Sequence, residues 1–332
     1  MVTAIVILIG IIVVVAAYFR LRSSFGMRAL RLAIRLPRHQ AKLAAMCPEP
    51  AQVLPHASAA LPLHLTEWGD AGPRVLLLHG GVQGGLGGGP ATLREQKSLA
   101  EHGYRLLVPD RPGFGQSPSR GPDDMEADAA WAATFLSGGA HLIGHSFGGA
   151  VALLAASRQP SATRSLILIE PALIPLLPRS KAMRSDEAVR ADFLRMGEAW
   201  LATRTPAEYG LALAKDLGVA SRDAGATEQS AKPDMARAAA FGCSLLRARF
   251  ASAAALREAA RAVADARIPA LIVTGGWSPT FDAVGQLCAE LTHGRHVIVQ
   301  SPNHFVQLNS QKEFNQAALE FMRQADRRWS AA

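Results

Sequence analysis

Ser146 stands in a pattern that can make a serine nucleophilic. Residues 144–148 read G-H-S-F-G, after a short apolar run and before an alanine-rich stretch. A serine on a sharp turn between a strand and a helix has its hydroxyl lifted clear of the sheet, and the helix N-terminus supplies N–H groups that can stabilise an oxyanion. The pattern predicts attack by the Ser146 hydroxyl on a carbonyl carbon. A glycine-rich turn without catalysis is the alternative for so short a motif.

Three further segments carry residues suited to the same chemistry. L-L-L-H-G-G ends at Gly81, D-R-P-G-F-G-Q-S begins at Asp110, and S-P-N-H-F contains His304. Together with the turn at Ser146, these segments resemble, in kind and in order, those of the α/β-hydrolase superfamily. The resemblance covers roughly residues 62–325 and is specific as a set.

The resemblance implies a role for each matching residue. Ser146 is the nucleophile, and His304 is the general base that later acts as general acid toward the leaving group. The backbone N–H groups of Gly81 and Phe147 are the expected oxyanion donors. The alternative for His304 is a histidine in a surface loop.

The acid of the triad is the point at which the chain departs from the family. The usual place is a G-x-x-D turn, but residues 275–279 read G-G-W-S-P and put Ser278 there. Glu170 ends the apolar run L-I-L-I-E-P, and some family members, many haloalkane dehalogenases among them, take their acid from the end of this earlier strand. A carboxylate in such a place needs a partner. Asp282 is the alternative acid, and a site without an acid is the third possibility.

Apolar runs alternate with Ala- and Leu-rich stretches through most of the chain, which predicts an α/β fold with a mostly parallel sheet and helices on both faces. This is the α/β-hydrolase fold that the resemblance implies, and we place its domain at residues 61–328. A helical insertion, the lid, is expected at about residues 171–266. The expected strands are Val75–Leu78, Arg105–Val108, His141–Ile143, Leu166–Ile169, Leu271–Val273 and His296–Val299.

The lid contains many large apolar residues, which predict a pocket for a hydrophobic acyl or alkyl group. Packing among the helices of the lid is the alternative. The glycine-rich stretch from Gly80 to Gly89 lacks the Lys-Ser/Thr ending of a phosphate loop and is expected to form a mobile wall of the site. The apolar lid residues are Leu173, Ile174, Leu176, Leu177, Met183, Phe193, Leu194, Met196 and Trp200.

The N-terminal segment has the length and the apolar composition of a membrane-spanning helix. Residues Val2 to Phe19 contain no charge, and as a helix they would span ~27 Å, close to the thickness of the hydrocarbon core of a bilayer. We predict a transmembrane anchor at residues 1–19, with a cleaved signal peptide as the alternative. The positive charges that follow predict a single-pass protein whose catalytic domain lies on the cytoplasmic side.

Residues 20–60 form a basic segment between the anchor and the domain. Arg20 to Met46 reads as an amphipathic helix, either lying on an anionic membrane surface or serving as a solvated linker. Apart from the seven basic residues of this segment, the chain holds 28 basic residues against 27 acidic ones, a net charge of +1, so nearly all of the net charge of +8 comes from these seven. A nearly neutral body excludes a nucleic-acid partner. The basic residues of the segment are Arg20, Arg22, Arg28, Arg31, Arg35, Arg38 and Lys42.

The three cysteines, Cys47, Cys243 and Cys288, are far apart and odd in number. This pattern lacks the paired spacing of a disulfide framework or a metal site, and it predicts free thiols.

The function expected from these patterns is hydrolysis of a small or hydrophobic ester through an acyl-enzyme, without metal or organic cofactor. C–C bond hydrolases, cofactor-free haloperoxidase-like enzymes and acyltransferases use the same scaffold and stay open as alternatives. A membrane-tethered binding protein that has lost catalysis is the rival from another class. The small-molecule substrate and membrane lipid, contacted through the anchor and the basic segment, are the expected partners.

Overall fold

The computed structural model describes residues 24–48, 63–85, 87–218 and 234–330. The anchor predicted at residues 1–19 lies outside the described residues. Within them, no helix combines the length and the apolar character needed to cross a bilayer.

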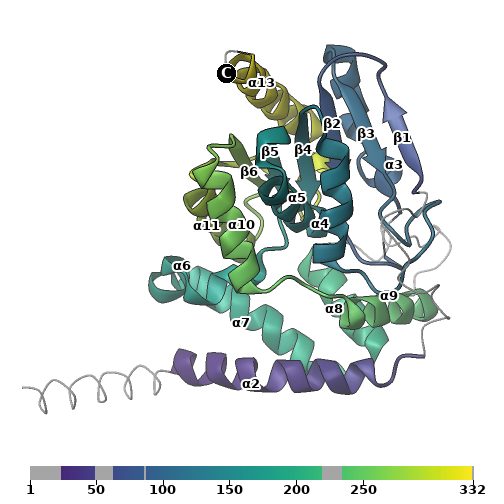
Figure 1. Cartoon of the computed structure of the whole chain (residues 1–332). Helices are drawn as coiled ribbons and strands as arrows, with labels where there is room; N and C mark the ends of the chain where they lie inside the picture. The colour runs from purple at the N-terminus through teal and green to yellow at the C-terminus, as the bar shows by residue number, and fades with distance from the viewer. Residues whose placement is uncertain (1–23, 49–62, 86, 219–233, 331–332) are drawn as a thin grey trace, which may run out of the picture.

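In the described chain, one sheet of seven strands forms the centre of the molecule, in the order β1-β3-β2-β4-β5-β6-β7 (Figure 1). Only β1 runs antiparallel to its neighbour, β3, and the other pairings are parallel. The prediction of a mostly parallel sheet is confirmed. The strands are β1 Leu65–Trp68, β2 Arg74–Leu78, β3 Arg105–Pro109, β4 Ala140–His145, β5 Thr163–Ile169, β6 Ala270–Thr274 and β7 Arg295–Ile298.

Helices cover both faces of the sheet because successive strand residues point to opposite sides. Leu76 and Leu142 pack toward α4 (Met125–Ala133), α5 (Phe147–Arg158), α10 (Ala253–Asp265) and α11 (Pro279–Thr292). Their neighbours Leu77 and Ile143 pack toward α13 (Gln311–Trp329) and the 3₁₀ helix η1 (Arg94–His102). The shorter helices are α3 Gly89–Thr92, η2 Thr134–Leu136, η3 Pro160–Ala162 and α12 Val306–Asn309.

The segment between β5 and α10 forms a helical cap beyond one end of the sheet (Figure 1). Side-chain oxygens of Ser180, Asp186, Thr205 and Asp234 accept N–H groups at the starts of α6, α7, α8 and α9, respectively, which fixes where each helix begins. The last helix of the predicted insertion, α10, packs against α5 and α11 in the layer that covers the sheet. The cap consists of η4 Ile174–Arg179, α6 Lys181–Ser185, α7 Glu187–Ala202, α8 Pro206–Asp216 and α9 Met235–Arg247.

Helix α2 (Ser24–Ala44) lies within the segment predicted as an amphipathic helix and runs along the cap, on the side away from the sheet (Figure 1). Arg28 pairs with Glu198 of α7 at 2.6 Å, and Gln40 donates to the Tyr209 hydroxyl of α8 at 2.6 Å. Leu32 is buried against α7. Ile34 of the same helix is 49% exposed.

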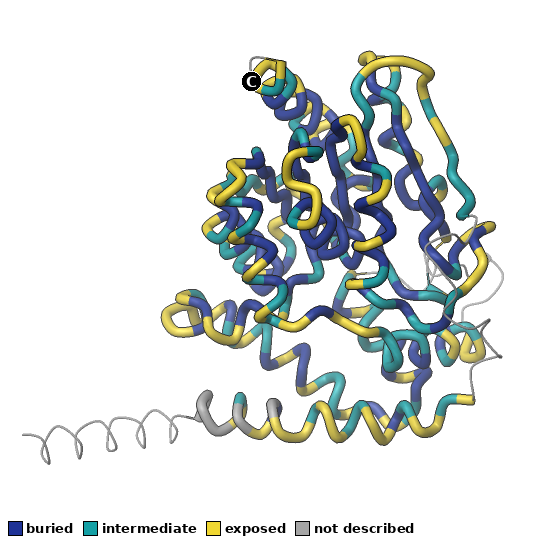
Figure 2. The backbone as a smooth tube through the Cα atoms, viewed as in Figure 1, coloured by how far each residue is buried: buried dark blue, intermediate teal, exposed yellow. Residues whose placement is uncertain are grey.

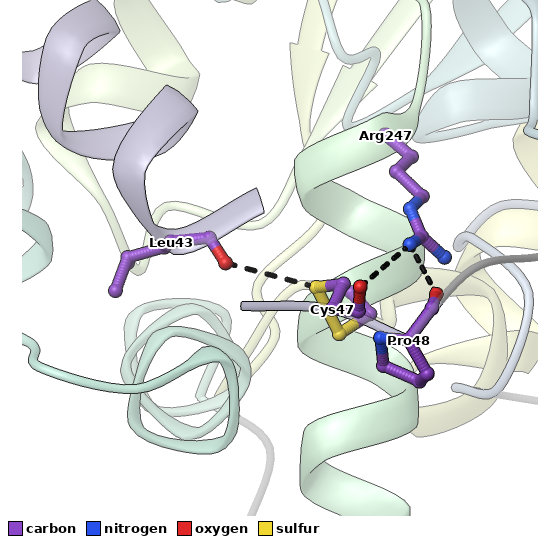
Figure 3. Close-up of a disulfide and its surroundings, with 5 residues drawn as sticks. Leu43, Cys47, Pro48 and Arg247 are labelled. Carbon is purple, nitrogen blue, oxygen red and sulfur yellow. Dashed lines mark hydrogen bonds between the residues drawn. A yellow bond between two sulfur atoms is a disulfide. The ribbon is translucent and has the colours of Figure 1, made fainter. Parts of the chain in front are cut away.

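A disulfide joins Cys47, just after α2, to Cys243 of α9 (Figure 3). The prediction of free thiols is therefore wrong for these two cysteines and correct for Cys288, which is free and buried. The two partners are 196 residues apart, so their meeting depends on how α2 packs on the cap and not on local spacing. Arg247 secures the same junction by donating to the backbone carbonyls of Cys47 and Pro48.

Candidate active site

Ser146 lies on the strained turn that its motif predicts. Its φ and ψ are 53° and −117°, values that a side chain other than glycine rarely adopts. Gly144 and Gly148 make the turn possible, because a Cβ on Gly144 would lie 2.4 Å from the Gly148 carbonyl oxygen and one on Gly148 would lie 2.3 Å from the carbonyl oxygen of Leu78. The turn places Ser146 at the N-terminus of α5.

Glu170 and His304 meet beside this turn. Glu170 follows β5, the strand next to β4, and its carboxylate Oε2 lies 3.5 Å from His304 Nδ1. The other oxygen, Oε1, accepts the backbone N–H of Gly275 at 2.6 Å and the indole N–H of Trp277 at 3.0 Å. Both side chains of the pair are almost completely buried. The partner expected for a buried carboxylate at Glu170 is thus present.

Ser278, in the usual acid position, and Asp282, four residues later, make contacts with residues other than His304. Ser278 caps α11 and donates its hydroxyl to Asp192 of the cap helix α7 at 2.8 Å. Asp192 also accepts the N–H of Thr280 at 3.2 Å, so this turn fastens the cap to the sheet layer. Asp282 accepts the backbone N–H of Gly276 at 3.3 Å, and among the described residues no hydrogen bond or ion pair joins Asp282 to His304. The geometry favours Glu170 as the acid.

Burial sets the protonation of the pair. It raises the pKa of Glu170 to about 8, against the opposing effect of the Trp277 and Gly275 N–H donors, and it lowers the pKa of His304 to about 3. An apolar environment disfavours the charged form of both groups. His304 therefore rests as a neutral imidazole, the form that can accept a proton.

Aromatic rings and backbone contacts hold His304 in place. The rings of Phe281 and His145 each lie with their centroids 4.8 Å from that of His304. His145 Nε2 lies 3.0 Å from the His304 carbonyl oxygen and donates to it, because a carbonyl can only accept. The backbone N–H of His304 donates to the carbonyl of Leu217, the residue just after α8. The histidine predicted from the sequence is thus buried, not in a surface loop.

The predicted oxyanion donors border the same space. Gly81 has φ 80°, a conformation that suits glycine, and Phe147 is the first residue of α5, where helix N–H groups lack an intrahelical acceptor. The glycine-rich loop after Gly81 is fastened by Asp110, whose carboxylate accepts the N–H of Gly89 at 2.9 Å. A Cβ on Gly88 would come within 1.8 Å of the Asp110 carboxylate, which explains why that position is glycine.

A cavity of about 800 Å³ joins Ser146, His304, Gly81 and Phe147 to the cap. Its volume is near the upper end of the range for small-molecule sites. Of the apolar lid residues singled out from the sequence, four line the cavity: Ile174, Phe193, Met196 and Trp200. Four of the others pack in the hydrophobic core with residues of the sheet, α5 and α10: Leu173, Leu176, Leu177 and Met183. Gln40 of α2 lines it as well, which makes α2 a wall of the site.

A family model described as alpha/beta hydrolase fold matches residues 73–311. The chain belongs to the α/β-hydrolase family. The recognition made from the four segments is thereby confirmed, while the roles of individual residues in catalysis stay predictions.

Curated relatives of this α/β-hydrolase include Lipase LipV of Mycobacterium tuberculosis, 34% identical over 146 residues, which are 41% of this chain and 52% of the relative. A 2-hydroxy-6-oxo-6-phenylhexa-2,4-dienoate hydrolase of Burkholderia cepacia is 36% identical over 115 residues, 33% of this chain and 40% of the relative. The chain thus matches about half of these relatives or less. A solved structure titled as a membrane phospholipase A shares the fold at 22% identity and TM-score 0.54, covering 96% of this chain and 98% of that one.

Several residues of the site were missed from the sequence. Trp277 donates to Glu170, Asp192 holds the turn at Ser278, and Gln40 reaches the cavity from α2. The tryptophan stood inside the G-G-W-S-P segment and could have been noticed there. The other two come from helices distant in sequence, and no local pattern marks them.

Proposed function

We propose that this α/β-hydrolase is a serine ester hydrolase acting on esters with a hydrophobic acyl group. The observation that carries the proposal is the convergence of the strained Ser146 turn and the Glu170–His304 pair on one apolar cavity. Lipase LipV, among the curated relatives, carries the name of such an activity.

The proposed reaction proceeds through an acyl-enzyme. Neutral His304 accepts the Ser146 hydroxyl proton while the oxygen attacks the ester carbonyl carbon, and the N–H groups of Gly81 and Phe147 stabilise the resulting oxyanion. His304 then gives its proton to the leaving alcohol. Water repeats the sequence, with His304 as base again, and releases the acid and free Ser146. Glu170 orients His304 and stabilises its protonated form.

The acyl preference follows from the cavity. Because each methylene removed from water contributes about 0.8 kcal/mol, we expect kcat/KM for p-nitrophenyl esters to rise at least about tenfold from acetate to octanoate. Spectrophotometric release of p-nitrophenol measures this directly. Leu245 lines the cavity and its neighbour Leu246 does not, so Leu245→Trp should lower the octanoate rate selectively while Leu246→Trp serves as the matched control.

The screen also tests the second candidate, C–C bond hydrolysis, which one curated relative carries in its name. A rate that is equal for all chain lengths would contradict the hydrophobic substrate. Cleavage of 2-hydroxy-6-oxo-6-phenylhexa-2,4-dienoate, with no hydrolysis of any ester, would replace the ester proposal by the C–C one.

We further propose that the outer face of α2 rests on an anionic membrane. Arg31, Arg35, Arg38 and Lys42 are exposed on this helix, and it carries no acidic residue (Figure 2). The exposed Ile34 adds an apolar contact to the same helix. The alignment with the membrane phospholipase A structure covers 96% of this chain, and residues 73–332 alone are too few to account for that share. The alignment therefore includes part of this N-terminal region. Such a position would put the cavity wall formed by α2 next to lipid.

Reversing charge on α2 should weaken this association. Each basic residue near an anionic surface contributes about 1 kcal/mol, so Arg31→Glu, Arg35→Glu and Arg38→Glu together should lower the partition ratio between phosphatidylglycerol-containing and pure phosphatidylcholine vesicles by about 100-fold. Because it compares two kinds of vesicle, the ratio removes any contribution to binding that residues 1–19 make equally to both. Sedimentation measures it.

The control changes the same charge elsewhere. Arg323, Arg327 and Arg328 are exposed on α13, on the opposite side of the molecule from α2 (Figure 1). Glutamate at these three positions should leave the ratio within about threefold of the wild type, because charges beyond a Debye length of ~10 Å are screened. Equal losses for the two triple variants would refute a role for α2.

A further inference from the structure

Arg111 has a buried guanidinium that the proposed reaction does not yet use. It follows β3 in the D-R-P-G segment, and its side chain is fully buried. One nitrogen lies 2.7 Å from an Asp123 carboxylate oxygen and another 2.8 Å from one of Asp128. A buried arginine between two carboxylates is costly to assemble, so its contacts define a single orientation of the fork.

The remaining contacts of Arg111 reach both residues of the expected oxyanion hole. Nη1 donates to the Gly81 carbonyl at 2.9 Å, and the guanidinium carbon lies 4.2 Å from the ring centroid of Phe147. The backbone N–H of Arg111 also donates to His79 Nε2 at 3.0 Å. Arg111 therefore contacts the segment of residues 79–81 at two points and Phe147, the first residue of α5, at a third.

His79 extends this support along the loop. Because its Nε2 accepts from Arg111, the ring proton resides on Nδ1, which donates to the Gly80 carbonyl at 3.0 Å. Burial, aided by the charge of Arg111, lowers the pKa of His79 to about 3, which keeps this tautomer neutral. The main chain of residues 79–81 is thus held by the 110–111 turn through side chain and backbone alike.

We propose that Arg111 is a positioning residue that sets the direction of the Gly81 and Phe147 N–H groups in the oxyanion hole. The inference rests on the proposed ester hydrolysis and extends it. Gly81 has no side chain and a positive φ, so its backbone has little intrinsic restraint and its orientation depends on what it contacts. The planar fork and stacking of arginine supply that restraint, and a lysine cannot reproduce them.

Arg111 acts on the oxyanion hole through the position of its side chain and not through its charge. The two carboxylates of Asp123 and Asp128 offset the guanidinium, and Arg120 adds a second cation to Asp128. The group as a whole is balanced and contributes little net field at Ser146. A displacement of about 1 Å in a group that stabilises the transition state costs about 100-fold in rate.

The test compares transition-state and ground-state binding in the full chain. Arg111→Lys keeps the charge. A second variant, Arg111→Met with Asp123→Asn and Asp128→Asn, removes the three buried charges together, so that only the partly exposed Arg120 loses an ion-pair partner. For each we measure kcat and KM with p-nitrophenyl octanoate, and inhibition by 1-octaneboronic acid, which forms a tetrahedral adduct with a nucleophilic serine, and by 1-octanol, which does not.

We expect kcat to fall by about 100-fold and the boronate inhibition constant to rise in parallel, while KM and the octanol constant change by less than about threefold. Arg120→Met is the matched control, because Arg120 contacts Asp128 but neither Gly81 nor Phe147; it should keep kcat within about threefold. Unfolding followed by circular dichroism separates loss of folded protein from loss of rate.

An equal rise in the inhibition constants of boronate and octanol, or wild-type kcat in both Arg111 variants, would overturn the role of Arg111. Either result would leave the proposed ester hydrolysis intact. A wild-type protein that neither hydrolyses the ester nor binds the boronate would overturn both proposals. If Arg120→Met matched the loss in Arg111→Lys, the ion-pair cluster in general would be responsible, and the specific role of Arg111 would be refuted.

Discussion

Replacing Ser146 with alanine is expected to lower kcat for p-nitrophenyl octanoate by about 10⁵-fold or more, to the level that binding and the oxyanion hole alone sustain. Without the hydroxyl no acyl-enzyme can form, whereas KM should change little because the apolar cavity remains. The variant should fold, since alanine removes one oxygen from a residue already held by its neighbours' backbone. The Ser146 N–H donates to Ile169, and its carbonyl accepts from Gly149 and Ala172.

Labelling separates catalysis from mere binding in the same experiment. A fluorophosphonate should modify the wild-type protein at Ser146, as read by mass spectrometry, and should leave Ser146→Ala unmodified. Ser157, on the same helix α5, donates to the Leu154 carbonyl, and Ser157→Ala is the matched control that should label as the wild type does. A wild-type protein that never labels would support the non-catalytic binding protein instead.

Replacing Glu170 with glutamine is expected to lower kcat by about 10³- to 10⁴-fold. The amide is nearly isosteric and its oxygen can still accept from Gly275 and Trp277, so the fold should persist. It carries no negative charge, however, and cannot stabilise the imidazolium that forms on His304 in the transition state. Asp282→Asn is the control and should retain most of the wild-type rate, because Asp282 contacts the Gly276 N–H and not His304.

The pH profile gives Glu170 a signature that a structural role would not produce. Burial raises the pKa of Glu170 to about 8, so the carboxyl is neutral below that pH and anionic above it. Only the anion stabilises protonated His304, and we therefore expect kcat/KM to increase as the pH rises through about 8. In Glu170→Gln this limb should disappear. A full rate in Glu170→Gln together with a large loss in Asp282→Asn would transfer the role to Asp282.

Much of the sheet and its central turn could be predicted from the sequence because the signals are local. Six of the seven strands in the described chain overlap the strands expected from the sequence, and Gly144 and Gly148 mark the Ser146 turn. Strand β1 was not predicted because L-T-E-W is short and half-exposed at the edge of the sheet. An edge strand lacks the continuous apolar pattern of a strand buried on both faces.

The contacts that complete the site are non-local, and for that reason the sequence left them open. Glu170 and Asp282 were both plausible acids until β5 and the loop after β7 were placed in space. The 3.5 Å approach of Glu170 to His304 depends on the order of strands in the sheet. Asp192, which accepts the hydrogen bond from the Ser278 hydroxyl, lies 86 residues before Ser278 in the sequence.

Helix α2 and its disulfide have a bearing on where the protein can mature. The Cys47–Cys243 bond ties a wall of the cavity to α9, and such bonds persist in oxidising compartments while cytosolic reductants remove them. The bond therefore predicts an oxidising compartment for the folded domain, whereas the charges that follow residue 19 predict the cytoplasmic side. Two free thiols on alkylation of the native protein without a reductant would contradict the bond. Under oxidising conditions α2 is therefore a covalent part of the chamber proposed to receive the substrate, and under reducing conditions only its non-covalent contacts with the cap hold it there.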